Sequence, residues 1–331
     1  MLRKIKPATV ACVTAVVLTS TAIACNIPVF RYALERWKPD ASEIVVFHDD
    51  KLSAADGEQL FKLQPTPASH LNATLVRVDV SKNTDPERRD LWTELKRNHA
   101  AALPYVLIRT KLGRGRYLNH WHGSLAQTEQ LELLQSPARN EIRQRLLAGH
   151  SVVWLLIGSA DAKRTQALRA MTEGCFDSLQ SNVELPEGIG LPGSELYAEV
   201  PLVLKFSLLE IKHGDPQEQL LLSLLTGLRL EAFEQGEPLL VPVFGRGRAL
   251  EVIPASDVSP ELIQDLTLYL SGACSCQVKE QNPGFDLMID ADWDSELFGD
   301  QENRPPDRST EEGKNRSQVL QIPPGRKLRT P

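Results

Sequence analysis

The alternation of apolar and polar residues predicts a first unit of strands and helices between residues 43 and 147. The compact apolar segment 43–48 and the alternating segment 74–80 are typical of strands. Between them, Ser53 stands where a helix N-cap is expected, and the helix should run through Leu63. The other elements expected in this unit are a helix at 85–100, a strand led by Pro104, a Gly-Arg-Gly turn, a strand at 116–125 and a polar helix from Gln127 to Leu147.

The same order of elements starts again after Gly149. Residues 151–159 are apolar without alternation, as in a strand buried inside a parallel sheet, and a helix is expected from Asp161. The later elements expected are a strand at 200–212, an apolar helix at 216–233, a strand led by Pro238, a second Gly-Arg-Gly turn, a paired strand and a helix capped by Ser259. The chain therefore predicts an α/β protein with two tandem βαβαββα units.

Two further segments are interpreted from local pattern. Residues 26–39 have the spacing of a short amphipathic helix, which should pack on the unit that comes next in the chain. The repeated GRGR at 113–116 and 245–248 is interpreted as hairpin chemistry, because phosphate binding needs a helix directly after a glycine loop and none is expected here.

The first residues predict export. A basic start is followed by the uncharged apolar run Ala8–Ala24, which ends in the small residues that a signal peptidase recognises. Cys25 comes next, and we favour a lipoprotein acylated at this thiol, although Ala22 stands where a lipobox usually carries Leu. A plain secretory signal, giving a secreted or periplasmic protein, and an uncleaved anchor slightly short of the ~20 residues of a membrane span are the alternatives. All three place the folded part outside the cytoplasm.

Composition sets the remaining limits. The 331 residues are 42% hydrophobic and 24% charged, which is typical of a globular protein and long enough for two domains. A net charge of -6 argues against a nucleic-acid partner, whose backbone requires a basic face. From Ser295 onward Pro, Gly, Ser and mixed charges predict a disordered tail. The expected division is a signal peptide at 1–24, domains at 25–149 and 150–294, and a tail at 295–331.

Three stretches of the first unit resemble the C-terminal half of a thioredoxin-like domain: VDVSKN at 78–83, LPYVLIR at 103–109 and GRYLNHWHGSLAQTEQL at 115–131. The resemblance implies a cis-proline at Pro104 and, in the more degenerate second unit, at Pro238. In that fold the first strand enters a helix through a C-x-x-C pair, whose thiol is activated by the helix N-terminus. The corresponding segment here, 48–60, contains no cysteine, so a dithiol oxidoreductase is not expected.

Only a few cysteines of the exported chain could bind a metal or form a disulfide. Cys274 and Cys276 form a C-x-C pair that could bind a soft metal such as copper, or form an easily reduced disulfide. A structural disulfide from Cys175 to one of them is the interpretation that we favour. Acylation of Cys25 would leave three thiols, of which at least one has no partner within the chain.

Metal binding is a weaker hypothesis. His120 and His122 flank Trp121 in an expected strand, so their side chains should leave on one face and could form a metal site with His48 or Asp49. We favour the simpler interpretation that they line the solvent face of an edge strand. The acidic run 290–296 has EF-hand spacing, but it lacks the glycine and the final glutamate that the motif requires.

The stretches 25–37 and 274–287, CNIPVFRYALERW and CSCQVKEQNPGFDL, are similar to a family of exported bacterial proteins, a resemblance that implies no activity. We therefore expect an exported, lipid-anchored, non-catalytic protein whose thioredoxin-like domains serve as a binding or structural module for an unidentified protein partner. No cofactor is expected, and no P-loop, dinucleotide or G-x-S-x-G motif occurs. Thiol–disulfide exchange or copper binding by Cys274 and Cys276 is the alternative.

Overall fold

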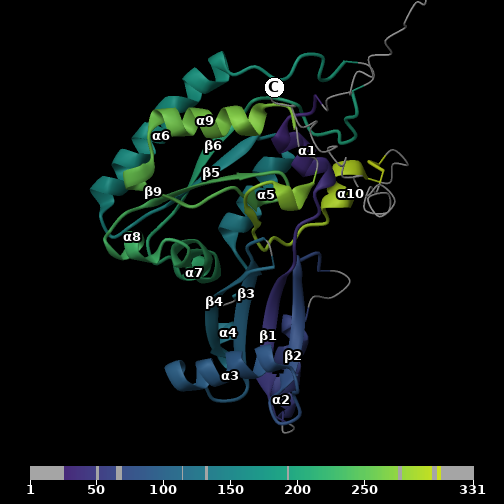
Figure 1. Ribbon diagram of the computed structural model, residues 1–331, viewed down its shortest axis with the longest axis vertical. Coiled ribbons are helices and arrows are strands. Elements are labelled where there is room, and N and C mark those ends of the chain that lie inside the picture. Colours follow the sequence, from purple (N-terminus) through teal and green to yellow (C-terminus); the bar gives the residue numbers. More distant parts are fainter. Residues whose placement is uncertain are drawn as a thin grey trace, which may run out of the picture.

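The computed structural model describes residues 26–49, 52–64, 69–113, 115–130, 133–191, 194–274, 278–299 and 304–306. They form a mixed α/β protein with two sheets, each of which contains parallel and antiparallel strand pairs. Figure 1 shows the two sheets stacked along the long axis, with β1–β4 at the bottom and the larger sheet above. The expected leader, Cys25, Cys276 and most of the expected tail lie outside the described residues.

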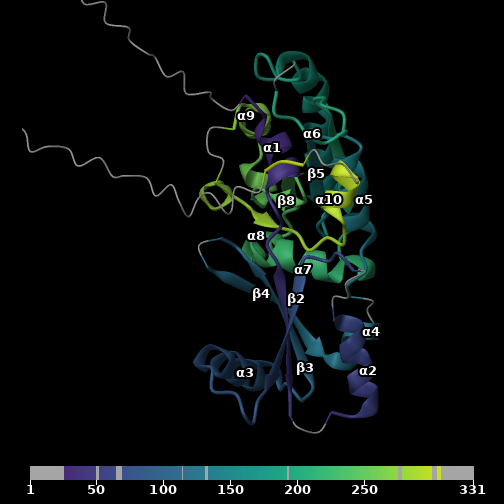
Figure 2. The ribbon, with the colours of Figure 1, turned by 90° about the vertical axis from the view of Figure 1, so that its right-hand side faces the viewer.

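The first sheet has the strand order β2-β1-β3-β4. Its strands are β1 (Ser42–His48), β2 (Ala73–Asp79), β3 (Tyr105–Lys111) and β4 (Tyr117–Ser124). β1 runs parallel to β2 and antiparallel to β3, which pairs antiparallel with β4. Successive residues of β1 enter opposite cores: Ile44 packs with α2 (Ala54–Leu63) and α4 (Leu125–Gln130), whereas Val45 packs with α3 (Pro86–His99). Helices therefore cover both faces of this sheet (Figure 2).

Capping side chains decide where the helices of the first unit begin. The Ser53 hydroxyl accepts the N–H of Asp56 at 3.0 Å and the Asp56 carboxylate accepts the N–H of Ser53, so α2 starts with a capping box. The single helix expected at 127–147 is instead two helices, α4 and α5 (Pro137–Leu147). Ser136 caps α5 and Pro137 occupies its first turn, and this start signal breaks the longer helix.

The second sheet has the order β10-β8-β7-β5-β6, and β9 pairs with β7. Its strands are β5 (Val152–Ile157), β6 (Phe206–Ile211), β7 (Leu239–Phe244), β8 (Arg248–Ala249), β9 (Ile253–Pro254) and β10 (Phe285–Asp286). β5 runs parallel to β6 and antiparallel to β7, so the order β6-β5-β7-β8 repeats that of the first sheet. β6 is shorter than the strand expected at 200–212.

Two layers of helices cover the second sheet. One face packs against α6 (Ala162–Asn182) and α9 (Pro260–Ser271), and the other packs against α5 and α7 (Gln219–Gly227). The apolar helix expected at 216–233 is divided into a 3-10 turn at Pro216–Glu218, α7 and α8 (Leu230–Glu234). Among the described residues, no helix has both the length and the apolar character needed to cross a bilayer.

The segment before β1 packs on the second sheet, not on the first. α1 (Val29–Arg36) belongs to the apolar cluster that contains Trp154 and Phe244, and Pro28 forms a β-bridge with Ala273 beyond α9. Residues 26–37, expected in the first domain, are therefore built into the second one, and the chain crosses to the first sheet only after Trp37.

The segment after β10 joins the two cores. Met288 lies in the core of the first sheet, while Leu287 and Ile289 lie in the core of the second. α10 (Trp293–Phe298) buries Leu297 and Phe298 in that second core. The tail expected to begin at 295 therefore begins inside a packed helix, because these two apolar side chains anchor residues that composition alone assigns to disorder.

Candidate binding cleft

The Gly-Arg-Gly turn between β7 and β8 fixes the end of α1 to α10. Arg246 is 6% exposed and donates to the carbonyls of Leu34 at 2.8 Å and Glu35 at 3.0 Å. These are among the last carbonyls of α1, which lack partners inside the helix. The same guanidinium pairs with Asp294 of α10 at 2.7 Å. Gly245 has a φ of +59°, and it lies so close to Ala33 that a side chain would collide with α1.

A second group of charges joins the chain crossover to β10. Asp286 is 4% exposed and accepts from Arg248 at 3.2 Å and from the backbone N–H of Asp40 at 2.7 Å. Lys279 contacts the Asp286 carboxylate, and its Nζ lies 3.3 Å from Asp40 Oδ2. Burial opposes the ionisation of Asp40, but Lys279 and Lys111 outweigh it and lower the pKa of this carboxyl. The two lysines therefore stabilise the ionised form of Asp40.

The face of α1 that packs against the segment before β6 carries a third group. Glu35 is 2% exposed and accepts from Arg31 at 2.8 Å and from the backbone N–H groups of Tyr197 and Ala198 at 3.2 Å. Arg31 in turn donates to the carbonyl of Val200 at 2.8 Å. Burial lowers the pKa of Arg31 although Glu35 opposes the shift. These bonds hold the extended segment before β6 against α1.

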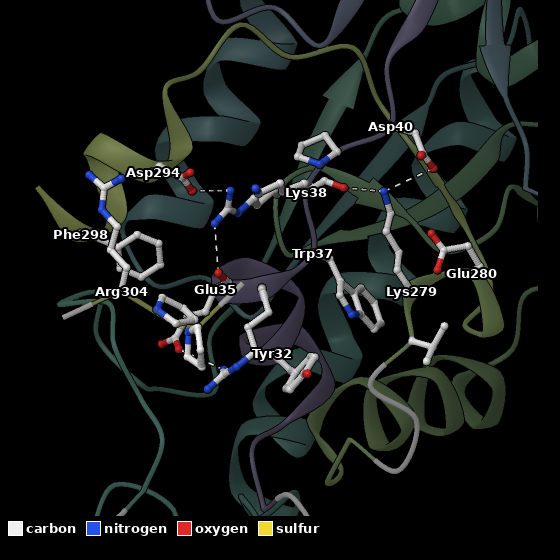
Figure 3. A pocket seen from close by; sticks show the side chains of 16 residues that line it. Tyr32, Glu35, Trp37, Lys38, Asp40, Lys279, Glu280, Asp294, Phe298 and Arg304 are labelled. Carbon is white, nitrogen blue, oxygen red and sulfur yellow. Dashed lines mark hydrogen bonds and ion pairs between the residues drawn. The ribbon is translucent and has the colours of Figure 1, made fainter. Parts of the chain in front are cut away.

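The three groups surround an open cleft of about 600 Å³ (Figure 3). Its walls are the end of α1, the crossover 37–40, residues 278–280, α10 and residues 304–306. In this view Asp294, Phe298 and Arg304 lie on one side, and Lys279 and Glu280 lie on the other. Five basic and four acidic side chains line it: Arg36, Lys38, Arg246, Lys279 and Arg304, with Glu35, Asp40, Glu280 and Asp294.

The charged side chains of this lining are mostly paired. Most of its charges are paired with one another or with backbone, so the walls are rigid and the cleft has little net charge. The described residues that line it include no serine, threonine, cysteine or histidine. The carboxylate of Asp294, 42% exposed, and that of the exposed Glu280 remain accessible to a ligand.

The described cysteines lie away from this cleft. Cys274 is 2% exposed in the apolar cluster beneath α1 and α9, and its backbone N–H donates to the carbonyl of Ile27 at 2.9 Å. Cys175 on α6 has a free thiol that donates to the carbonyl of Met171 at 3.2 Å, so the disulfide expected from Cys175 is not formed. Burial, with a contribution from Glu261, raises the pKa of the Cys175 thiol and makes its reactive thiolate scarcer.

The connections from β1 to α2 and from β5 to α6 carry helix-capping residues instead of thiols. Ser53 caps α2 after β1, and Asp161 caps α6 after β5 by accepting the N–H groups of Lys163 and Arg164. The Leu103–Pro104 peptide bond is cis. The bond before Pro238 is trans, so the expectation of a cis-proline there is wrong; trans is the default for X-Pro unless the surrounding structure selects the other isomer.

The two histidines of β4 do not share a face. A β-bulge makes Ile108 pair with Trp121 but Arg109 with Asn119, so His120 is an extra residue in the ladder. The regular alternation that would align His120 with His122 is therefore broken. The expectation that both rings line one solvent-exposed face is wrong, because His120 is buried between Thr110 and Ser223.

Each ring has a different environment. His120 lies 3.1 Å from Thr110 Oγ1 and 3.1 Å from Ser223 Oγ on α7, and burial together with Arg139 lowers its pKa to about 3. His122 instead bonds the Tyr105 hydroxyl at 2.8 Å. The His48 ring bonds the carbonyl of the adjacent Asp49 at 3.0 Å. No group of three or more metal-ligating side chains occurs in the described part of the chain.

The cleft residues were missed by sequence reasoning, which treated the GRGR turn as a local hairpin. The only local signal was an arginine between two glycines, and its partners lie more than 40 residues away in the chain. No protein-family model matches the chain, and comparison with curated proteins finds no significant match.

Proposed function

We propose that this chain is an exported, lipid-anchored protein made of two thioredoxin-like units and that it acts as a non-catalytic binding or structural module. The strand orders β2-β1-β3-β4 and β6-β5-β7-β8, each with one parallel and two antiparallel pairs, support two thioredoxin-like βαβαββα units. The apolar run Ala8–Ala24 followed by Cys25 supports export and acylation.

The observation that carries the non-catalytic assignment is the residue type at the starts of α2 and α6, the helices that follow β1 and β5. A thioredoxin-type enzyme places its thiolate at the N-terminus of the helix after the first strand, where the helix lowers the thiol pKa. Here the Ser53 hydroxyl and the Asp161 carboxylate occupy those helix starts as caps. Neither group can attack a disulfide or cycle between oxidation states.

The thiol-dependent alternative depends on Cys274 and Cys276. Exchange requires a thiolate that reaches a substrate disulfide, and the 2% exposure of Cys274 opposes such contact. A copper site of two sulfurs would need the same buried side chain. The cleft, with rigid walls and two accessible carboxylates, is the better candidate for contact with a partner protein.

The experiment compares the full chain with its Cys274→Ser and Cys276→Ser variants in an insulin-reduction assay and a Cu(I) titration with a chromophoric chelator. We expect no acceleration and no stoichiometric copper uptake by any of the three. A signal in the unmodified chain that either variant loses, with an unchanged circular dichroism spectrum, would establish the thiol activity and refute the proposal. Mass spectrometry of the mature N-terminus tests the anchor, with a diacylglyceryl mass expected on Cys25.

A further inference from the structure

We infer that the end of the second unit that carries Asn26 faces the membrane, that Leu191, Leu268 and Tyr269 contact the lipid there, and that the first unit points away from the bilayer. The inference rests on the proposed lipid anchor at Cys25. The occupant of the surface is a phospholipid bilayer.

The described chain begins in a fixed position. The Asn26 side chain donates to the carbonyl of Glu187 at 3.3 Å, the carbonyl of Ile27 accepts from Cys274, and the N–H of Val29 donates to Gly272 at 3.0 Å. Ile27 is 1% exposed, so detaching this segment would bring a buried side chain into water. One residue of chain spans at most ~3.8 Å, which leaves an acyl group on Cys25 almost no slack. The bilayer surface must therefore lie next to the 187–191 loop and the end of α9.

Three exposed apolar side chains belong to these same elements. Seven large apolar side chains of the described chain are exposed: Phe61, Met171, Leu191, Val203, Leu230, Leu268 and Tyr269. Leu191 is 64% exposed and lies in the loop that bonds Asn26. Leu268 is 45% exposed, and its carbonyl accepts the N–H of Gly272, the residue that bonds Val29. Tyr269 adds an aromatic ring with a polar tip, a side chain favoured at membrane interfaces.

The long axis of the molecule then sets the orientation. In Figures 1 and 2 the start of α1 and the end of α9 lie at one end of the molecule, and α2 and α3 of the first unit lie at the other. Phe61 is 67% exposed and belongs to α2, the helix that both figures place away from α1. A flexible tether would leave both ends free to approach the lipid. A tether without slack admits only the end that carries Leu191.

The test places an added tryptophan at each end of the full-length, lipidated protein reconstituted in phosphatidylcholine vesicles with brominated acyl chains. Leu191→Trp is the test variant and Phe61→Trp is its matched control, since both positions are highly exposed and tolerate a larger ring. Bromine quenches tryptophan only at close range, and interfacial side chains lie ~5–10 Å deep. The emission of the five native tryptophans is subtracted in both variants. We expect the vesicles to reduce the remaining emission of the tryptophan at 191 about twofold and to leave that of the tryptophan at 61 unchanged.

The outcomes separate the two proposals. Equal quenching at both positions, or no quenching at 191 in protein that still floats with the vesicles, overturns the inferred orientation and leaves the anchor intact. Protein that does not float and carries an unmodified Cys25 refutes the anchor itself, and the proposed function with it. Quenching at 191 alone supports both.

Discussion

Replacing Gly245 with alanine tests whether α1 is fixed to the second unit by close contact at the Gly-Arg-Gly turn. The Cβ of an alanine at 245 would lie 2.7 Å from the Cβ of Ala33 and 3.2 Å from its carbonyl carbon. Ala33 is 1% exposed within α1, and its methyl group has no rotamer by which to move aside. Relief therefore requires α1 itself to shift.

The magnitude has two parts. The left-handed backbone at Gly245, with φ of +59°, costs a non-glycine residue roughly 1–2 kcal/mol, which the stiffer unfolded chain offsets in part. Overpacking against Ala33 adds roughly 1–3 kcal/mol. Gly236 is the matched control, because its φ is +80° but no atom lies within 4 Å of an added Cβ. Gly245→Ala should therefore lower the free energy of unfolding by about 1–3 kcal/mol more than Gly236→Ala does.

Urea unfolding followed by circular dichroism measures both variants, and a double variant isolates the contact. Ala33→Gly alone should cost about 1 kcal/mol of helix propensity. Combined with Gly245→Ala it removes the methyl collision, so the double variant should be more stable than the sum of the single effects by about 1–2 kcal/mol. Equal costs at 245 and 236, or additivity between 245 and 33, would refute the proposed contact.

Three further predictions concern polar groups that hold the units together. His120, whose pKa of about 3 lies below its unfolded value of 6.5, leaves the folded protein with fewer bound protons between these pH values. Its contribution to stability should fall with decreasing pH by up to about 1.4 kcal/mol per unit, His120→Asn should remove that slope, and NMR should show no His120 titration above pH 4. Asn72→Ala removes hydrogen bonds to the backbone of Asp40, Leu287 and Ile289 and should lower the free energy of unfolding by about 2–4 kcal/mol. An unchanged urea midpoint would contradict those hydrogen bonds. Lys279→Met removes one of the two cations that contact the buried Asp286, which keeps Arg248 and the Asp40 N–H, and should cost about 1–3 kcal/mol in urea unfolding. The same substitution should cost less in an Asp286→Asn background, and an equal cost in both backgrounds would argue against the ion pair.

Features that depend on neighbouring residues are the ones that could be predicted from the sequence. Ser53 and Ser259 cap the helices expected to follow them, and the uniformly apolar residues after Ser151 form the buried strand β5. The break at Ser136–Pro137 was missed although the same start signal was present, because the polar pattern on both sides continued at helical spacing. Local chemistry thus locates a helix start where the residue pattern also changes, and a start is overlooked where the pattern continues through it.

Features that depend on distant partners could not be predicted. The periodicity of α1 indicates an apolar face but does not say which sheet covers it, and the covering sheet begins over a hundred residues later. His120 shows a related limit. Placing alternate residues of a strand on one face of the sheet assumes regular pairing, and a single β-bulge reverses the face on which the next side chains lie. Arg246 looked like a turn residue because each of its acceptors lies far away in the chain.

These distant contacts also explain why a chain with two similar sheets need not behave as two independent domains. α1 is bonded to the second unit before the first begins, and residues 287–289, which follow β10, place side chains alternately in both cores. Asn72 of the first unit bonds this same returning segment. A contact that shifts residues 287–289 must therefore strain both cores at once, whereas one that shifts α1 strains the core of the second sheet. Such coupling suits a rigid module more than a hinged one, which agrees with a cleft whose charged walls are already paired.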